Sequence, residues 1–399
     1  MNTYLYEVLD HLIAFDTVST NSDIPAMEYL ADHIDQRGFT TVLHKSEIAR
    51  AAQANLVAWA GPPTTDGLII SGHLDTVPFA GQPGWEREPL RMEVTDDRVF
   101  GRGTTDMKGF LAQCVDAARM IDQQRLRRPV VFIFTASEEI GGLGAQRVAP
   151  ELPDLLGDVP CPSLAWIGEP TSWAIHAAHK SAVIVEIMVR GKGGHSGAPD
   201  QGVNAIAVAG KVIETIGRLQ EERRQLPNPE LAAMFPGSPF DVMNIGTISG
   251  GIAENVIAEQ CRLRVSYRSL PGTEPTALRD EIARRCAAID THDYASHNSR
   301  ATIEVGPARV MPPMAARRGT ALERALLQTT QTSAVTGAPF CTDGGWFALA
   351  GIDSLICGPG EYAEAHQPNE SIGRAAFQHG TALILEVIEK LCCQPRAPA

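Results

Sequence analysis

Short apolar runs alternate with helix-like segments through the first half of the chain, and this alternation constrains the fold most. The apolar runs cover residues 54–59, 67–72, 129–135 and 163–168, and the helical patterns cover residues 1–15, 24–37 and 108–124. Apolar runs of this length, bounded by glycine, proline or polar residues, are typical of strands buried on both faces. Because such strands alternate with helices, we expect an α/β sandwich with a mostly parallel sheet.

The pattern changes near residue 180. It then predicts a strand, a helix, two strands, a helix and a strand, over residues 181–191, 202–225, 241–249, 256–268, 274–289 and 301–305. This βαββαβ order is that of a ferredoxin-like unit. The α/β pattern returns after residue 312, with a helix, a strand and a helix over residues 319–332, 354–358 and 372–391. We therefore expect a larger domain in two parts, residues 1–179 and 309–399, with a small domain, residues 180–308, inserted between them.

The composition excludes some classes of partner. The formal net charge is -13, which disfavours nucleic acid and anionic membranes as partners. No apolar run approaches the roughly 18 residues of a membrane span, and the N-terminus shows no basic segment followed by an apolar one. The 8 cysteines are scattered without zinc-type Cys-x-x-Cys spacing, as reduced thiols are. We therefore expect a cytoplasmic protein with neither nucleic acid nor membrane as partner.

Acidic residues and histidines stand at the ends of the predicted strands and just before a predicted helix. They are, in chain order, His73, Asp75, Asp106, Glu138, Glu139, Glu169 and, in a late loop, His366. Up to Glu169 these groups follow one another at intervals of roughly thirty residues, the length of one βα unit. Since the carboxyl ends of parallel strands meet at one edge of a sheet, we expect these side chains to lie close together there.

Two imidazoles and three carboxylates at one edge point to a metal centre. Nitrogen and oxygen ligands suit Zn²⁺ and also accept Co²⁺ or Mn²⁺, and this number of ligands fits two ions bridged by a carboxylate and a hydroxide. Three clustered carboxylates without a cation would repel one another strongly. Each residue alone has an ordinary explanation: a buried hydrogen-bonded pair for His73 and Asp75, an N-cap for Asp106, a turn for Glu169. Their joint order and spacing favour the metal centre.

The motifs that carry these residues resemble those of one family. They read, in order, "GHLDTVP", "GRGTTDMKG", "TASEE", "GEPT", "GGHSGAPDQGVNAI" and "HQPNE". Together they resemble the two-zinc amidohydrolases and peptidases that include acetylornithine deacetylase, succinyl-diaminopimelate desuccinylase, aminoacylase and the glutamate-releasing carboxypeptidases, over essentially the whole chain. The resemblance implies that His73, Asp106 and Glu169 hold one zinc ion. It implies that Asp106, Glu139 and His366 hold the other.

The same resemblance implies roles for Glu138 and Asp75. Glu138 would be the general base that takes a proton from the bridging water and hands it to the departing amine. Asp75 would orient His73. Because adjacent residues of a strand point to opposite faces, Glu139 would bind metal while Glu138 faces the water, unless a turn at the strand end changes this geometry.

The inserted domain is expected to contribute to the site. In relatives, the histidine that corresponds to His195 reaches the active site of the partner subunit and stabilises the oxyanion, so we expect a homodimer through residues 180–308. Asn255 and Arg268 match positions that bind the transition state and the substrate carboxylate. Arginine suits a carboxylate because its guanidinium donates two parallel hydrogen bonds.

Three more residues are predicted to contact the substrate. Gly358 and Gly360 stand in "GPGEYAEAHQPNE", just before His366. Asp343, in "APFCTDGGWFA", stands where the deacetylases have a glutamate. Asp343 would therefore contact a cationic substrate side chain, or it would mark a different acyl-amino acid.

The stretches "DTVPFAGQPGWEREPL", "TDMKGFLA" and "GPGEYAEAHQPNE" are most similar to acetylornithine deacetylases. The expected substrate is a small N-acylated amino acid, and the expected reaction converts N2-acetylornithine to ornithine and acetate, a step of arginine biosynthesis. Alternatives within the family are a desuccinylase or a dipeptidase. A non-catalytic metal-binding scaffold is the alternative of another class, and Glu138 disfavours it because a structural cage needs no base. A nucleotide-dependent enzyme is excluded, since no glycine-rich phosphate fingerprint follows a strand.

Overall fold

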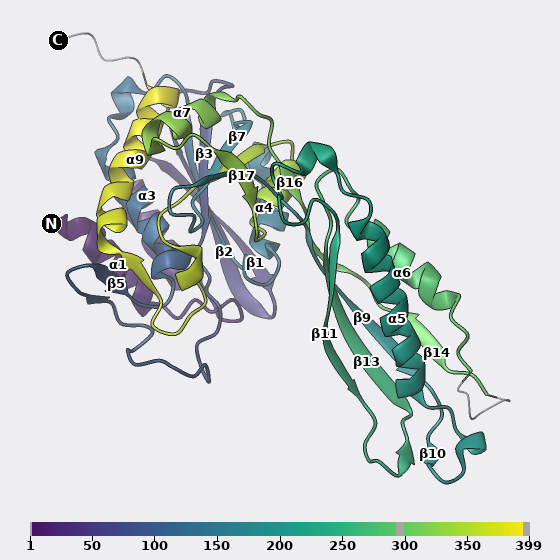
Figure 1. Cartoon of the computed structure of the whole chain (residues 1–399). Helices are drawn as coiled ribbons and strands as arrows, with labels where there is room; N and C mark the ends of the chain where they lie inside the picture. The colour runs from purple at the N-terminus through teal and green to yellow at the C-terminus, as the bar shows by residue number, and fades with distance from the viewer. Residues whose placement is uncertain (1, 293–298, 394–399) are drawn as a thin grey trace. The chain divides into compact units, whose positions relative to one another are not determined.

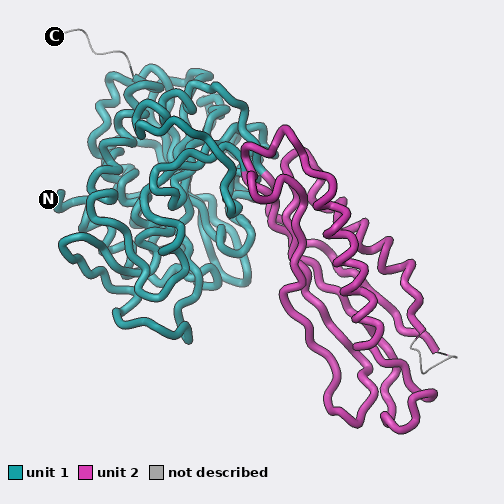
Figure 2. The backbone as a smooth tube through the Cα atoms, in the orientation of Figure 1, with its two compact units in different colours: residues 1–178, 314–399 teal, residues 179–313 magenta. Residues whose placement is uncertain are grey.

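The chain divides into two compact units, and each is described by itself. The computed structural model describes residues 2–292 and 299–393. Residues 1–178 and 314–399 form unit 1, and residues 179–313 form unit 2 (Figure 2). The second division thus falls after residue 313, whereas the sequence predicts it after residue 308. The reason is strand β15 (Arg309–Met311), which pairs with β9 of unit 2.

Unit 1 is built on a nine-stranded sheet. Its order is β1-β2-β6-β3-β7-β18-β8-β16, and β17 also pairs with β8. The strands are β1 (Thr40–Ile48), β2 (Ala51–Ala60), β3 (Leu68–His73), β6 (Val130–Thr135), β7 (Leu164–Ile167), β8 (Ile175–His179), β16 (Met314–Ala315), β17 (Val335–Ala338) and β18 (Asp353–Ile356). The central strands β6, β3, β7 and β18 run parallel, and β1, β2 and β8 run antiparallel to their neighbours. The predicted α/β sandwich with a mostly parallel sheet is confirmed.

Helices cover both faces of this sheet (Figure 1). They are α1 (Thr3–Ala14), α2 (Ile24–Asp35), α3 (Gly109–Met120), α4 (Leu143–Leu155), α7 (Ala321–Thr330), α8 (Gly344–Leu349) and α9 (Arg374–Cys392). Helix α3 packs between α1 and α9 against β3, and α4 packs against β1, β2 and α8. Every residue of β3 and β6 is buried, as expected for strands covered on both faces. No helix in the described part of the chain is both long enough and apolar enough to span a membrane.

The parallel strands end at one edge of the sheet, and this edge positions the site. Strand β3 ends at His73, which pairs with Thr135, the last residue of β6. Strands β7 and β18 end side by side at Ile167 and Ile356. The loops that follow these four strands carry most of the predicted site residues, because parallel strands deliver their carboxyl ends to the same edge.

A small three-stranded sheet joins two distant segments beside this edge. It consists of β4 (Glu93–Val94), β5 (Arg98–Phe100) and β19 (Ser371–Gly373), in the order β19-β5-β4. Strand β5 precedes the turn that carries Asp106, and β19 follows the loop that carries His366. Pairing of Phe100 with Ser371 therefore brings these two parts of the site together.

Unit 2 has the predicted βαββαβ order. Its elements are β9 (Ala182–Arg190), α5 (Ala205–Arg224), β11 (Val242–Gly250), β13 (Gln260–Arg268), α6 (Ala277–Ala287) and β14 (Thr302–Val305). The sheet order is β11-β13-β9-β14, with antiparallel pairs, and the core lies between this sheet and the two helices. The predicted single strand over 256–268 is wrong, since β12 (Val256–Ile257) leaves the sheet and pairs instead with β10 (Gly194–His195).

Candidate active site

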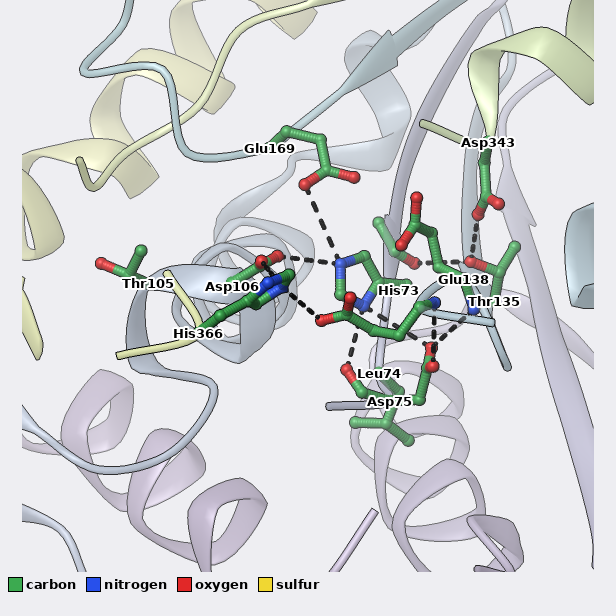
Figure 3. A network of polar contacts seen from close by, with 12 residues as sticks. His73, Leu74, Asp75, Thr105, Asp106, Thr135, Glu138, Glu169, Asp343 and His366 are labelled. Carbon is green, nitrogen blue, oxygen red and sulfur yellow. Dashed lines mark hydrogen bonds and ion pairs between the residues drawn. The ribbon is translucent and has the colours of Figure 1, made fainter. Parts of the chain in front are cut away.

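Five loops and strand ends of unit 1 bring seven ionisable side chains into one cluster, and Figure 3 shows the polar contacts in it. His73 ends β3, and Asp75 follows it two residues later. Asp106 lies in a distorted turn, Thr104–Lys108, directly before α3. The remaining members come from the loops after β6, β7 and β18, and they are Glu138, Glu139, Glu169 and His366. The structure therefore brings together the whole set that strand-end spacing predicts.

Asp106 lies at the centre of this cluster. Its Oδ1 is 2.9 Å from Nε2 of His73, and its Oδ2 is 3.1 Å from Nε2 of His366. Nε2 of His366 is also 3.1 Å from Oε1 of Glu139. On the other side, Nε2 of His73 is 3.9 Å from Oε2 of Glu169. Each oxygen of Asp106 thus faces one imidazole, and each imidazole has a second carboxylate beside it.

The hydrogen bonds of His73 fix which nitrogen faces the carboxylates. Its Nδ1 lies 3.0 Å from the backbone oxygen of Asp75, and a carbonyl oxygen only accepts, so Nδ1 carries a proton. Nε2 is left to face Asp106 and Glu169. Burial lowers the pKa of His73, but the hydrogen bonds to Asp106 and Asp75 and the charge of Glu169 outweigh it and hold the pKa well above its ordinary value. The carboxylates around Nε2 of His73 therefore strongly favour a positive charge at this atom.

The acidic side chains show the same need for a cation. Burial, together with the neighbouring carboxylates, raises the pKa of Glu138 and of Glu169 well above the ordinary value. Burial and the charge of Asp106 raise the pKa of Glu139 to about 7. Asp106 instead has a lowered pKa, because its bonds to the two imidazoles outweigh its burial. The cluster contains more buried carboxyl groups than its two imidazoles can neutralise, and divalent cations would remove this imbalance of charge.

The donor set fits metal ions. Ligand atoms of His73, Asp106 and Glu139 lie within 4.8 Å of one another, close enough to belong to one metal centre. Imidazole nitrogen and carboxylate oxygen are ligands that zinc and similar divalent ions accept. The orientation of His73, with Nδ1 bound to a backbone oxygen, is the usual support for a ligand that binds through Nε2.

The two adjacent glutamates do not lie in a strand, so the predicted alternation of their side chains is wrong. Strand β6 ends at Thr135, and Ser137 has a φ of 54°, which turns the chain. The backbone oxygen of Glu138 then accepts hydrogen bonds from the N–H groups of Gly141 and Gly142. A tight turn, rather than the pleat of a strand, sets the directions of the Glu138 and Glu139 side chains.

Asp75 holds this turn. Its Oδ1 accepts a 2.9 Å hydrogen bond from the backbone N–H of Glu138, and its Oδ2 accepts a 3.2 Å bond from that of Glu139. The hydroxyl of Ser19 donates to the same Oδ2 at 2.5 Å. The carboxylate lies 3.6 Å from Nδ1 of His73, farther than the backbone oxygen of Asp75 itself. The carboxylate of Asp75 therefore supports the two glutamates more directly than it supports His73.

The variant Asp75→Asn should lower kcat by about 10–100-fold while the protein stays folded. Asparagine offers one acceptor oxygen where aspartate offers two, so the N–H of Glu138 or that of Glu139 loses its acceptor. Steady-state kinetics and circular dichroism measure the two effects. Ser19→Ala is the matched control, because it removes only a donor to Asp75. Equal kinetics for Asp75→Asn and the wild type would contradict this role.

The sequence reasoning missed Ser19 and Thr135. The hydroxyl of Thr135 donates a 2.5 Å hydrogen bond to Oδ2 of Asp343, which ties the end of β6 to the start of α8. Thr135 gives a signal in the sequence, since it is the polar residue that closes the apolar run 129–135. Ser19 gives none, because it contacts Asp75 across a separation of 56 residues.

Asp343 is buried, with 2% of its surface exposed, against Thr135. Burial raises the pKa of its carboxyl to about 6, although the bond from Thr135 lowers it. Its Oδ2 accepts the bond from Thr135 (Figure 3), whereas its Oδ1 is buried with no hydrogen-bond partner among the described residues. Direct contact between Asp343 and a cationic substrate stays a prediction.

Gly358 and Gly360 allow two backbone segments to approach the site closely. A Cβ on Gly358 would lie 2.1 Å from the backbone oxygen of Gly168, next to Glu169. A Cβ on Gly360, whose φ is +83°, would lie 2.7 Å from Oγ1 of Thr105. The structure thus places both glycines beside metal-centre residues, and their contact with substrate stays a prediction.

His195, Asn255 and Arg268 all belong to unit 2. His195 lies on the β10–β12 ribbon, and the N–H of Ser196 donates a 3.0 Å hydrogen bond to the backbone oxygen of Asn255. His195 is exposed, and its Nδ1 accepts a 2.9 Å bond from the N–H of Gly197. In the neutral ring the proton is therefore on Nε2, ready to donate. Arg268 is the last residue of β13.

Comparison with known proteins identifies the class. Residues 69–390 match the family model described as peptidase family M20/M25/M40, and the chain belongs to this family. Its members hydrolyse amide bonds, so the protein is a hydrolase of amide bonds. Two similar proteins carry the name acetylornithine deacetylase. The one from Proteus mirabilis (strain HI4320) is 31% identical over 96% of this chain and 94% of its own length. The one from Myxococcus xanthus is 30% identical over 97% of each chain.

Solved structures show the same fold at lower identity. The M20 family metallo-carboxypeptidase Sso-CP2 from Sulfolobus solfataricus has a TM-score of 0.77 at 18% identity, over 98% of this chain and 99% of that chain. Human carnosine dipeptidase 1 has a TM-score of 0.73 at 17% identity, over 97% and 95%. YXEP from Bacillus subtilis, described as a dinuclear metal-binding peptidase of the M20 family, has a TM-score of 0.67 at 18% identity, over 96% of each chain.

Proposed function

We propose that the protein is a two-zinc hydrolase that removes the acetyl group from N2-acetylornithine and releases ornithine and acetate. The observation that carries the metal centre is the position of Asp106, with one oxygen toward each imidazole. In this proposal His73, Asp106 and Glu169 hold one ion, and Asp106, Glu139 and His366 hold the other. Zinc is the proposed metal, with Co²⁺ or Mn²⁺ as substitutes that accept the same ligands.

Glu138 is the proposed general base. When bound, two divalent cations supply charge that polarises the amide carbonyl and makes a neighbouring water more acidic. The Glu138 carboxylate takes a proton from that attacking water and passes it to the amide nitrogen, which then leaves as an amine. The Asp75 bond to the Glu138 N–H supports this role, since it fixes the base in the turn beside His73.

Residues of unit 2 complete the proposed site. The Nε2–H of His195 donates to the developing oxyanion. Asn255, the residue before Val256, which pairs with His195, stabilises the same transition state. Arg268 binds the substrate carboxylate with its forked guanidinium. We propose that His195 is supplied across a homodimer formed through residues 180–308. The proposed reaction belongs to arginine biosynthesis in the cytoplasm.

The substrate assignment predicts an order of activities at fixed zinc. N2-acetylornithine should give a kcat/KM at least about tenfold above acetylcitrulline, succinyl-diaminopimelate and a dipeptide, a difference of about 1.4 kcal/mol in transition-state binding. The full-length protein, loaded with zinc, is assayed by the release of free amine. A higher kcat/KM for the succinyl substrate would make the protein a desuccinylase. A higher value for the dipeptide would make it a dipeptidase, and either result would contradict the proposal.

The variant Asp343→Asn tests the cationic contact within the same panel. If Asp343 faces the ornithine side chain, the variant raises KM for acetylornithine by about tenfold and leaves acetylcitrulline, whose side chain is neutral, nearly unchanged. An equal rise in KM for both substrates would show that Asp343 acts only through its contact with Thr135. Thr135→Val, which removes the hydroxyl that donates to Asp343 and keeps the Asp343 carboxylate, is the matched control.

A further inference from the structure

A buried ion pair lies next to the metal centre, and neither member is used in the proposed reaction. Nη1 of Arg102 is 2.7 Å from Oε2 of Glu370, and each side chain is only 1% exposed. Arg102 belongs to the motif "GRGTTDMKG" and Glu370 to "HQPNE". Because desolvation offsets most of the attraction in a buried ion pair, such a pair is weak evidence for stability alone. The other contacts of the two side chains indicate what the pair does.

Glu370 holds the backbone of Asp106. Its second oxygen, Oε1, accepts hydrogen bonds of 3.0 Å from the N–H of Thr105 and from the N–H of Asp106. The hydroxyl of Thr105 donates a 2.8 Å bond to the backbone oxygen of Ser371, the residue after Glu370. Two neighbouring residues thus fix the turn that carries the central carboxylate.

Arg102 holds the backbone around His366. Its Nη2 donates a 2.7 Å hydrogen bond to Oε1 of Gln82, and Nε2 of Gln82 donates a 2.8 Å bond to the backbone oxygen of His366. Nη1 of Arg102 also contacts the backbone oxygen of Gln367 at 3.4 Å. His366 has a φ of 63°, a left-handed conformation that is unfavourable for a residue with a Cβ and needs support from its surroundings.

We infer that Arg102 and Glu370 are positioning residues that hold Asp106 and His366 at the right separation to share one metal ion. The inference rests on the proposed metal centre. The pair's contacts lead to Asp106, which belongs to both halves of that centre, and to His366, which belongs to one half, whereas His73 is held by the backbone oxygen of Asp75. The ion shared by Asp106, Glu139 and His366 should therefore depend on the pair more than the ion beside Glu169 does.

The test compares metal binding by the full-length wild type and the variants Glu370→Gln and Arg102→Met. Glutamine keeps an oxygen for the N–H groups of Thr105 and Asp106, but its amide turns a donor toward Arg102. Methionine removes the charge and the donors of Arg102. Zn²⁺ is titrated against a competing chelator, the visible spectrum of the Co²⁺-loaded protein is recorded, and kcat and KM are measured. We expect one of two metal equivalents to bind about 10–100-fold more weakly in both variants, with a changed Co²⁺ spectrum and a kcat that falls more than KM changes.

Two further variants separate positioning from stability. Asp116→Asn breaks a buried acid–arginine contact on α3, where Asp116 accepts a 2.7 Å bond from Arg119, and it should leave both metal affinities unchanged. Gln82→Ala removes the link between Arg102 and His366, together with the acceptor of the Trp85 indole N–H, and should weaken the same single equivalent. If Arg102→Met does not fold, Glu370→Gln and Gln82→Ala decide the question.

Unchanged metal affinity in folded Glu370→Gln would overturn the inference, and so would an equal loss of metal in Asp116→Asn. In both cases a wild type with two bound equivalents would leave the proposed function intact. A wild type that binds fewer than two equivalents would instead overturn the proposed metal centre, and the inference with it.

Discussion

Replacing Glu138 with glutamine should lower kcat by about 1000-fold or more, while two equivalents of metal remain bound. Glutamine has nearly the same shape, but its amide cannot accept the proton of the attacking water. Glu138 is buried, and burial with the nearby charges of Glu169, Glu139 and Asp343 raises its pKa. Steady-state assays with acetylornithine and elemental analysis of the same preparation measure the two quantities.

The control for Glu138→Gln is a glutamate-to-glutamine change at the surface of unit 1. Glu151, on α4, contacts His44 at 3.2 Å, and more than half of its side chain is exposed. Glu151→Gln should keep the kcat of the wild type. A kcat within tenfold of wild type for Glu138→Gln would contradict its role as the base. Loss of both metal equivalents would instead make Glu138 part of the metal-binding set.

Replacing Asp106 with asparagine should have the second large effect. Asparagine has one oxygen, so it cannot face both His73 and His366 with an acceptor, and its amide group turns a donor toward one of them. Both metal equivalents should bind more weakly, and kcat should fall by about ten-thousandfold, because the charge that stabilises the transition state is lost. Chelator competition and kinetics at saturating zinc measure the two effects.

Glu169→Gln is the comparison that makes this prediction specific. Of the two imidazoles of the cluster, that of His73 is the one within ion-pair distance of Glu169, at 3.9 Å, so loss of the Glu169 carboxylate should weaken one equivalent and leave the other. Asp106→Asn should weaken both. If the two variants lose metal to the same extent and in the same pattern, Asp106 does not link two sites.

The sequence correctly predicts which residues gather at the carboxyl ends of the parallel strands, and the reason is geometric. Buried parallel strands are continuous apolar runs, so the ends of β3, β6 and β7 are visible in the sequence, and parallel pairing brings those ends together. Strands β1, β8, β16 and β17 of this sheet have no counterpart among the predicted strands. In β1 the sequence "TTVLHKSEI" mixes apolar and charged residues, because β1 is an outermost strand of the sheet and is half exposed.

Other parts of the site depend on tertiary contacts that local patterns do not encode. The turn after β6 begins at Ser137 with a positive φ, which a non-glycine residue rarely adopts, so the strand pattern predicts the wrong geometry for Glu138 and Glu139. Asp75 accepts hydrogen bonds from the two glutamates, which follow it in the sequence by 63 and 64 residues. Glu370 meets Asp106 from 264 residues away. The motifs contain these residues, but their hydrogen-bond partners become known only when the chain is folded.

Anomalous X-ray scattering at the zinc absorption edge, from crystals of the zinc-loaded protein, tests the metal centre most directly. Two peaks are expected in unit 1, one between His73 and Glu169 and one between Glu139 and His366, with Asp106 bound to both. A single peak, a peak elsewhere, or no peak from protein that retains full activity would contradict this expectation.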